Sequence, residues 1–282
     1  MARPATDGGR FDARIARARR LAGEHPASSQ ILTFYAALAG MQKSLIGDAR
    51  PASDVRPSVA SPPPLGDAVG RIVSAIPEFL SFLARTAPAQ LAEAARAMRA
   101  VEPQEWRALL DRYWDADAHD VPDADDATLF VVEALLQPFA ESLAIASGAT
   151  EPGRGAPAAT PPRIARCPVC AGKPLVGVLR ESGQSARRSL VCGLCLAEWP
   201  WPRVVCPACG EDTFDALPVY RSDAFPAARV DACERCRTYH KTIDLSRDAL
   251  AIPIVDELAC VPLDLWAREQ GYAKLRPNLL RM

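Results

Sequence analysis

Eight cysteines form four Cys-X-X-Cys pairs, and no other residues in this chain are as well suited to chemistry. The pairs are Cys167 and Cys170, Cys192 and Cys195, Cys206 and Cys209, and Cys233 and Cys236. Two residues between thiolates let the backbone turn tightly, so that both sulfurs point at one metal ion, and two such turns complete a tetrahedral site. The spacing therefore predicts two mononuclear metal sites, each held by four thiolates.

The gaps between the pairs suit short strands that lead from one turn to the next. The simplest pairing is sequential, so that Cys167, Cys170, Cys192 and Cys195 form one site and Cys206, Cys209, Cys233 and Cys236 form the other. Spacing alone leaves an interleaved pairing open. Thiolates bind zinc and iron in the same tetrahedral geometry, so the ligand type does not choose the metal either.

The remaining candidates for chemistry are weaker. The ninth cysteine, Cys260, lies in an apolar stretch and is predicted to pack in the interior. His25, His119 and His240 are predicted not to be ligands, because each site already has four thiolates. We find no Ser/His/Asp arrangement, no phosphate-binding glycine loop and no HExxH motif, so no catalytic residue and no enzymatic activity are predicted.

Composition narrows the class of protein. The net charge is -1, and basic residues only slightly outnumber acidic ones between residues 163 and 241. This balance disfavours nucleic acid as a partner, although a zinc-ribbon module that binds nucleic acid or another protein is the second hypothesis. No long apolar run predicts a membrane span, and no apolar region follows the N-terminal arginines, so we expect a cytoplasmic protein. Disulfides are rare in that compartment, which favours metal ligation.

Apolar periodicity predicts six helices before the cysteines, at residues 11–22, 29–45, 68–86, 88–100, 103–115 and 124–146. A proline-rich loop at 47–66 interrupts them, and a Gly-, Ala- and Pro-rich linker at 148–162 ends the helical domain, 1–147. Short β-type runs follow at 176–179, 189–191, 199–205 and 217–220, and a last helix is expected at 255–270. The fold class is α+β multidomain: an N-terminal all-α domain, two small metal-binding β modules (163–205 and 206–282) and a C-terminal helix.

From Cys167 onward the sequence resembles the FdhE family of formate dehydrogenase accessory proteins. The matching pieces include Cys167-Pro-Val-Cys170, Cys192-Gly-Leu-Cys195, Cys206-Pro-Ala-Cys209-Gly210, Cys233-Glu-Arg-Cys236-Arg-Thr-Tyr239-His-Lys241 and Leu263-Asp264-Leu-Trp-Ala-Arg-Glu269. One departure is Ala171, where a glycine often follows the first pair.

The resemblance implies rubredoxin-like modules that hold two mononuclear tetrathiolate metal ions, with iron favoured and zinc as the alternative. It also implies a cytoplasmic maturation factor that binds the catalytic subunit of formate dehydrogenase and is not itself a dehydrogenase. We expect the partner to contact the tail, 253–282, and the groove between the helical domain and the metal modules.

Overall fold

The computed structural model describes residues 7–46, 65–66, 68–119, 121–149, 163–182 and 185–282. Nearly all of the predicted proline-rich loop, 47–66, lies outside the described residues. The same holds for most of the predicted linker, 148–162.

The six predicted N-terminal helices are confirmed. They are α1 (Asp7–Glu24), α2 (Ser29–Ile46), α3 (Ala68–Thr86), α4 (Ala89–Ala97), α5 (Pro103–Asp115) and α6 (Asp126–Ala146), with the 3-10 turns η1 (Pro26–Ser28), η2 (Met98–Ala100) and η3 (Asp117–His119) between them. Asp125 caps the N-terminus of α6, where its carboxylate accepts a hydrogen bond from the N–H of Thr128 at 3.0 Å. Such a side chain replaces a hydrogen bond that the first turn of a helix lacks.

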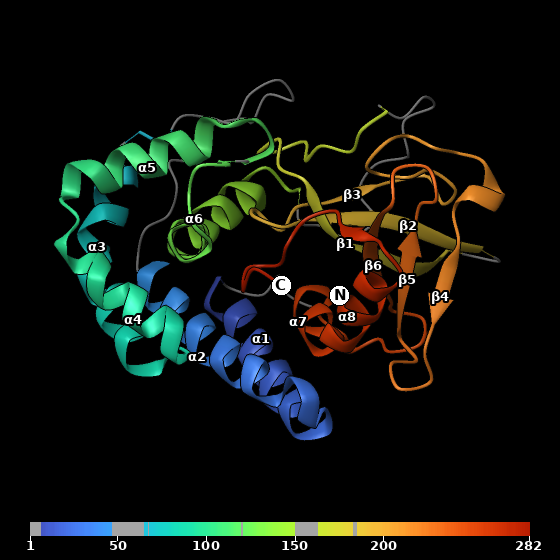
Figure 1. Ribbon diagram of the computed structural model, residues 1–282, viewed down its shortest axis with the longest axis horizontal. Coiled ribbons are helices and arrows are strands. Elements are labelled where there is room, and N and C mark those ends of the chain that lie inside the picture. The colour runs from blue at the N-terminus through green and yellow to red at the C-terminus, as the bar shows by residue number, and fades with distance from the viewer. Residues whose placement is uncertain (1–6, 47–64, 67, 120, 150–162, 183–184) are drawn as a thin grey trace.

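α6 is the central helix of the α domain (Figure 1). Its length and its mean hydropathy of 1.6 would suit a membrane span, but 78% of the apolar window is buried inside the fold. Two buried glutamates on α6 each pair with an arginine: Glu133 with Arg276 and Glu141 with Arg14. α6 is therefore a core helix, and α2, α3, α4 and α5 pack against it.

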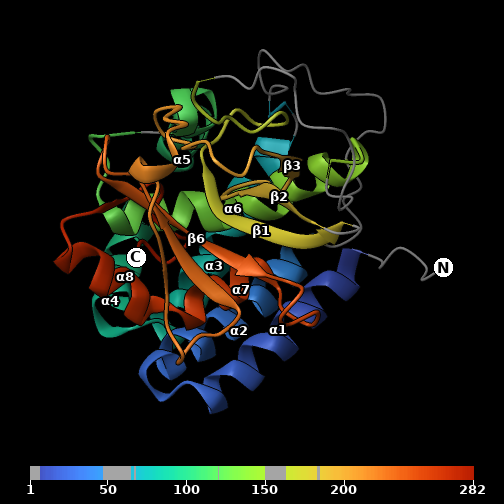
Figure 2. The same ribbon diagram turned by 90° about the vertical axis from the view of Figure 1, so that its right-hand side faces the viewer.

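All described strands belong to one sheet. They are β1 (Pro174–Ser182), β2 (Ser185–Cys192), β3 (Glu198–Pro200), β4 (Val219–Arg221), β5 (Ala228–Ala232), β6 (Thr238–Asp244) and β7 (Ala273–Lys274), in the order β3-β2-β1-β6-β5-β4 with β7 against β6. β1 and β6 run parallel, with Val176 opposite Lys241. A Cβ on Gly177 would overlap the side chain of Thr242, so only glycine lets these strands approach. The two predicted β modules thus share a sheet (Figure 2).

The strands differ from the expected ones in two places. The predicted strand 199–205 ends at Pro200, because Pro200 and Pro202 have no N–H to donate to a ladder. β5 and β6 were not predicted at all. Their sequences are ARVDA and TYHKTID, and nearly every residue is buried although many are polar.

The tail forms two helices where one was expected. α7 (Pro253–Ala259) and α8 (Val261–Glu269) meet at Cys260. The break follows from Pro262, which lacks an N–H and whose ring would collide with the preceding turn of a continuous helix.

Two hydrophobic cores join the helices to the cysteine-rich half of the chain. The first core packs α3, α5 and α6 around the first four cysteines. The second core packs α1, α2 and α7 against one face of the sheet, where Val176, Val230 and Ile243 project. α7 lies between α1 and the sheet in Figure 1. Each core therefore takes residues from both sides of the predicted linker.

Candidate metal centres

The four Cys-X-X-Cys turns share one backbone geometry. In each, the N–H of the first cysteine bonds to the carbonyl five residues later, at 2.8–2.9 Å. The residue after the second cysteine has a left-handed backbone, with φ between 56° and 75°; these residues are Ala171, Leu196, Gly210 and Arg237. Glycine adopts this conformation at the least cost. Ala171 keeps the backbone conformation that Gly210 has at the equivalent place and differs only in its side chain.

The turns bring the eight cysteines together in two groups of four, with the sequential pairing. In the first group the Sγ atoms of Cys167 and Cys195 are 3.4 Å apart, as are those of Cys170 and Cys192. In the second group the corresponding distances are 3.8 Å for Cys206 to Cys236 and 3.7 Å for Cys209 to Cys233. Within each group all ligand atoms lie within 4.8 Å of one another.

These distances fit a metal ion. A tetrahedron with metal–sulfur bonds of about 2.3 Å has edges of about 3.8 Å. Backbone N–H groups also point at the sulfurs at 3.4 Å, from Val169 to Cys167, from Leu194 to Cys192 and from Ala208 to Cys206. Hydrogen bonds of this kind stabilise a charged thiolate. The donor set therefore suits a divalent or trivalent ion at the centre of either group.

The surroundings of the two groups differ. All four cysteines of the first group are buried, whereas Cys209 and Cys236 of the second group are partly exposed. Burial raises the pKa of Cys167 and of Cys195 well above the usual value. Without a cation such thiols stay protonated, so metal binding there would release protons.

In the second group burial raises the pKa of Cys233 to about 11. Burial also acts to raise the pKa of Cys236, but hydrogen bonds from Thr238 lower it overall, and the Thr238 Oγ1 lies 2.9 Å from the sulfur. The more open group thus has a partly accessible sulfur with a nearby hydroxyl.

A buried arginine lies beside each group. Arg276 approaches Cys192 across Gly193, where any Cβ would overlap the guanidinium. Arg188 lies near Cys206 and donates to the carbonyls of Arg203 at 3.1 Å and Pro202 at 3.2 Å. Four thiolates around a divalent ion carry a net charge of −2, and a buried cation offsets the cost of holding that charge away from water. No spacing in the sequence pointed to either arginine.

The helical domain also holds the first group directly. Gln137 on α6 donates to the carbonyl of Gly193, inside the second turn, at 3.3 Å. Of the three histidines, His25 stacks on Phe225 and His240 accepts a hydrogen bond from Arg188 at 2.7 Å. His119 lies close enough to the first group to lower the pKa of Cys170, after the larger effects of the neighbouring cysteines.

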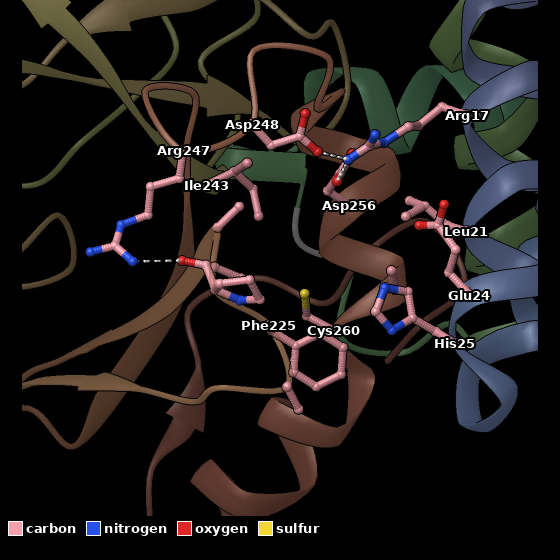
Figure 3. Close-up of a pocket in the computed structure, with 15 residues that line it drawn as sticks. Arg17, Leu21, Glu24, His25, Phe225, Ile243, Arg247, Asp248, Asp256 and Cys260 are labelled. Atoms are coloured by element: carbon pink, nitrogen blue, oxygen red, sulfur yellow. Dashed lines mark hydrogen bonds and ion pairs between the residues drawn. The ribbon is translucent and has the colours of Figure 1, made fainter.

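Cys260, the ninth cysteine, is buried away from both groups. Burial raises the pKa of its thiol to about 12. Its sulfur points into a cavity of about 650 Å³ between α1 and the β4–β5 connection (Figure 3). His25 and Phe225 form one wall of this cavity, and the ion pairs of Arg17 with Asp248 and Asp256 form another.

The comparisons with known proteins agree with this arrangement. The sequence profile of the FdhE central domain matches residues 166–203, and that of the FdhE C-terminal domain matches residues 204–281. Residues 166–281 of this chain thus match both of these FdhE domains. The matched region begins one residue before Cys167 and contains both cysteine groups.

Curated FdhE homologs align over the same region. The Aquifex aeolicus protein is 37% identical over 115 residues, which is 40% of this chain and 41% of the homolog. The Pseudomonas aeruginosa homolog is 35% identical over 119 residues, which is 40% of this chain and 38% of the homolog. The chain thus spans about two fifths of the length of the curated relatives it matches.

The fold extends further than the sequence likeness. A crystal structure of the FdhE protein from Pseudomonas aeruginosa superimposes with a TM-score of 0.70 and covers 99% of this chain and 97% of that one. Sequence identity over the superposition is 24%, so this match establishes the fold. The helical domain, the shared sheet and the C-terminal helices therefore form an FdhE fold.

Proposed function

We propose that this protein is a non-enzymatic accessory factor for the maturation of formate dehydrogenase, acting in the cytoplasm on the catalytic subunit. The observation that carries the proposal is the coincidence of the FdhE match, residues 166–281, with both cysteine groups. The eight cysteines are the proposed ligands of two metal ions, and each thiolate serves both as ligand and as a staple of the fold.

Iron is the proposed metal, with zinc as the alternative. The second group carries this part of the proposal, because Cys209 and Cys236 are partly exposed. A bound iron there could exchange one electron with a partner, whereas the first group is enclosed by the core. Metal analysis and visible spectra after anaerobic purification test the assignment. Full maturation activity with zinc in both sites would contradict a redox role.

The cavity of about 650 Å³ is the proposed partner contact, since it lies in the groove between the helical domain and the second cysteine group's half of the sheet. Its lining includes the apolar side chains of Leu21, Phe225 and Ile243, beside the ion pairs of Arg17 with Asp248 and Asp256. An apolar surface bordered by polar groups is typical of a contact between proteins.

The arginines of the metal modules favour a protein partner over nucleic acid. Arg180 pairs with Glu198 at 2.8 Å and Arg235 with Glu211 at 3.0 Å. Arg237 pairs with Glu234. The paired carboxylates neutralise the charge of these arginines, so they would attract phosphates only weakly.

Anaerobic affinity capture from cells grown with nitrate tests the proposed partner. Wild-type protein and Phe214→Ala should recover the catalytic subunit of formate dehydrogenase, and Cys206→Ser/Cys209→Ser should not. Phe214→Ala is the control because this exposed side chain lies outside both cysteine groups and does not line the cavity. Recovery of nucleic acid instead, with a strong dependence on salt, would favour the zinc-ribbon alternative.

A second pair of variants tests the cavity. Phe225→Ala removes one wall and should weaken capture, while Phe214→Ala, at a side chain that is 77% exposed elsewhere on the metal module, should not. Metal content is measured in both variants. Equal capture by the two variants would show that the partner does not bind at the cavity. The assignment of the metal sites would be unaffected.

A further inference from the structure

His119 belongs to the helical half of the chain, yet its ring lies at the first cysteine group. It ends η3, between α5 and α6, and is 6% exposed. A Cβ placed on Gly172 would meet Cδ2 of His119 at 2.9 Å, Sγ of Cys170 at 3.3 Å and Sγ of Cys192 at 3.4 Å. The imidazole and two of the four sulfurs therefore surround the same point.

The ring is held in place from its far side. Its Nδ1 lies 3.1 Å from the carbonyl oxygen of Tyr113, and its plane stacks on the Tyr113 ring at 5.4 Å between centroids. Trp114 packs beside it at 5.8 Å. The backbone of His119 has φ of 57°, a left-handed conformation that most residues avoid. His119 thus has an unfavourable backbone conformation, and this conformation directs its side chain toward the first cysteine group.

The second ring nitrogen of His119, Nε2, takes no part in the contacts that hold the ring. Nε2 of His119 is buried and has no hydrogen-bond partner among the described residues. A buried nitrogen without a partner costs free energy, and a thiolate sulfur is an acceptor within the same small space. The second cysteine group takes its side-chain donor from its own strand, where the hydroxyl of Thr238 lies 2.9 Å from Cys236.

We propose that His119 is an outer-sphere positioning residue of the first metal centre, donating a hydrogen bond from Nε2 to the thiolate of Cys170. The first metal and the docking of the helical domain are then coupled, because a bound ion gives the buried nitrogen its acceptor. Among the described residues, no histidine of the helical domain reaches the second cysteine group.

Zinc release from the full-length protein tests this inference and needs no formate dehydrogenase. Both sites are loaded with zinc, and its transfer to a coloured chelator is followed in time. Outer-shell partners of metal ligands typically contribute 10–100-fold to metal affinity. We expect His119→Phe, which keeps a flat ring without N–H groups, to release the first zinc at least 10-fold faster while the second zinc leaves at the wild-type rate.

Two further variants make the outcome decisive. His119→Gln retains an N–H donor and should release the first zinc more slowly than His119→Phe. His25→Phe, at a histidine outside both groups, should match the wild type.

In cobalt-loaded protein the sulfur-to-cobalt absorption band of the first site should shift in His119→Phe alone. Wild-type release and an unshifted band in His119→Phe would overturn the inference, as would equal acceleration of both zincs. If His119→Phe does not fold, His119→Gln is compared with the wild type. Faster release of the first zinc with unchanged release of the second upholds the inference, and unchanged or equally accelerated release of both zincs overturns it.

Discussion

Arg188 in β2 lies 2.7 Å from Nε2 of His240 in β6, and this contact connects the strand that leads into Cys192 with the strand that follows Cys236. A guanidinium only donates hydrogen bonds, so Nε2 of His240 must accept and the ring must be neutral. Burial, and then the charge of Arg188, lower the pKa of His240 to about 3.

This contact predicts a loss of stability in acid. In the unfolded chain His240 binds a proton near pH 6.5, but in the folded protein only near pH 3. The unfolded state therefore binds more protons between these values, so the contribution is complete above pH 6.5 and falls by about 1.4 kcal/mol per pH unit below it. Denaturant unfolding of wild type and His240→Gln between pH 7 and pH 5 measures the difference in slope. Parallel slopes would contradict the prediction.

The unequal burial of the two cysteine groups predicts unequal effects of ligand loss. Cys170 lies in the first core, whereas Cys209 is partly exposed. Structural zinc contributes roughly 10–16 kcal/mol of binding free energy in small domains, and in the first group that energy also holds the helices. Cys170→Ser should abolish cooperative unfolding in calorimetry, while Cys209→Ser should keep a transition at a modestly lower Tm. A similar thermogram from both variants would show that the groups are equivalent.

The left-handed residues after the cysteine pairs predict opposite effects of reciprocal substitutions. Ala171 has φ of 58°, so Ala171→Gly should stabilise the protein by about 0.5–1 kcal/mol. Gly210 has φ of 75°, and a Cβ there would lie 2.7 Å from the carbonyl oxygen of Arg163, so Gly210→Ala should destabilise by at least about 1 kcal/mol. Chemical denaturation of the metal-loaded proteins gives both values. The same sign for both variants would argue against the backbone explanation.

The buried Lys241 predicts a large effect on the stability of the fold. Its ammonium is fully buried and lies 2.9 Å from Glu257 and 2.6 Å from Asp264. Lys241→Met would leave two buried carboxylates with less compensating charge, so we expect a loss of about 3–5 kcal/mol. Lys43→Met is the matched control, because Lys43 pairs with Asp12 at the surface, where such pairs contribute at most about 1 kcal/mol. Equal unfolding midpoints for the two variants would refute the prediction.

The burial of polar residues explains why the sequence does not predict β5 and β6. Strand predictions depend on alternating or continuous apolar residues, but β6 carries His240, Lys241 and Thr242 in its buried centre. Each of these finds a partner on another element: Arg188, Asp264 and Asp231 respectively. A strand whose burial depends on distant partners has no local apolar pattern.

The sequence by itself determined the local features of this protein. Helical periodicity placed α1 to α6, and the spacing of Cys167 and Cys170, like that of the other three pairs, determined turns that aim two sulfurs at one point. These features depend on residues close together in the chain, so local sterics and hydrogen bonding are sufficient to specify them.

Tertiary structure alone decided how these features combine. Only the parallel pairing of β1 with β6 joined the two β modules in one sheet. Only long-range packing brought Arg276, His119 and Gln137 to the first cysteine group, from positions that no spacing rule connects to it. The physical reason is that a buried charge or hydrogen-bond donor is tolerated only where the complete fold supplies its partner, and that partner can lie anywhere in the chain.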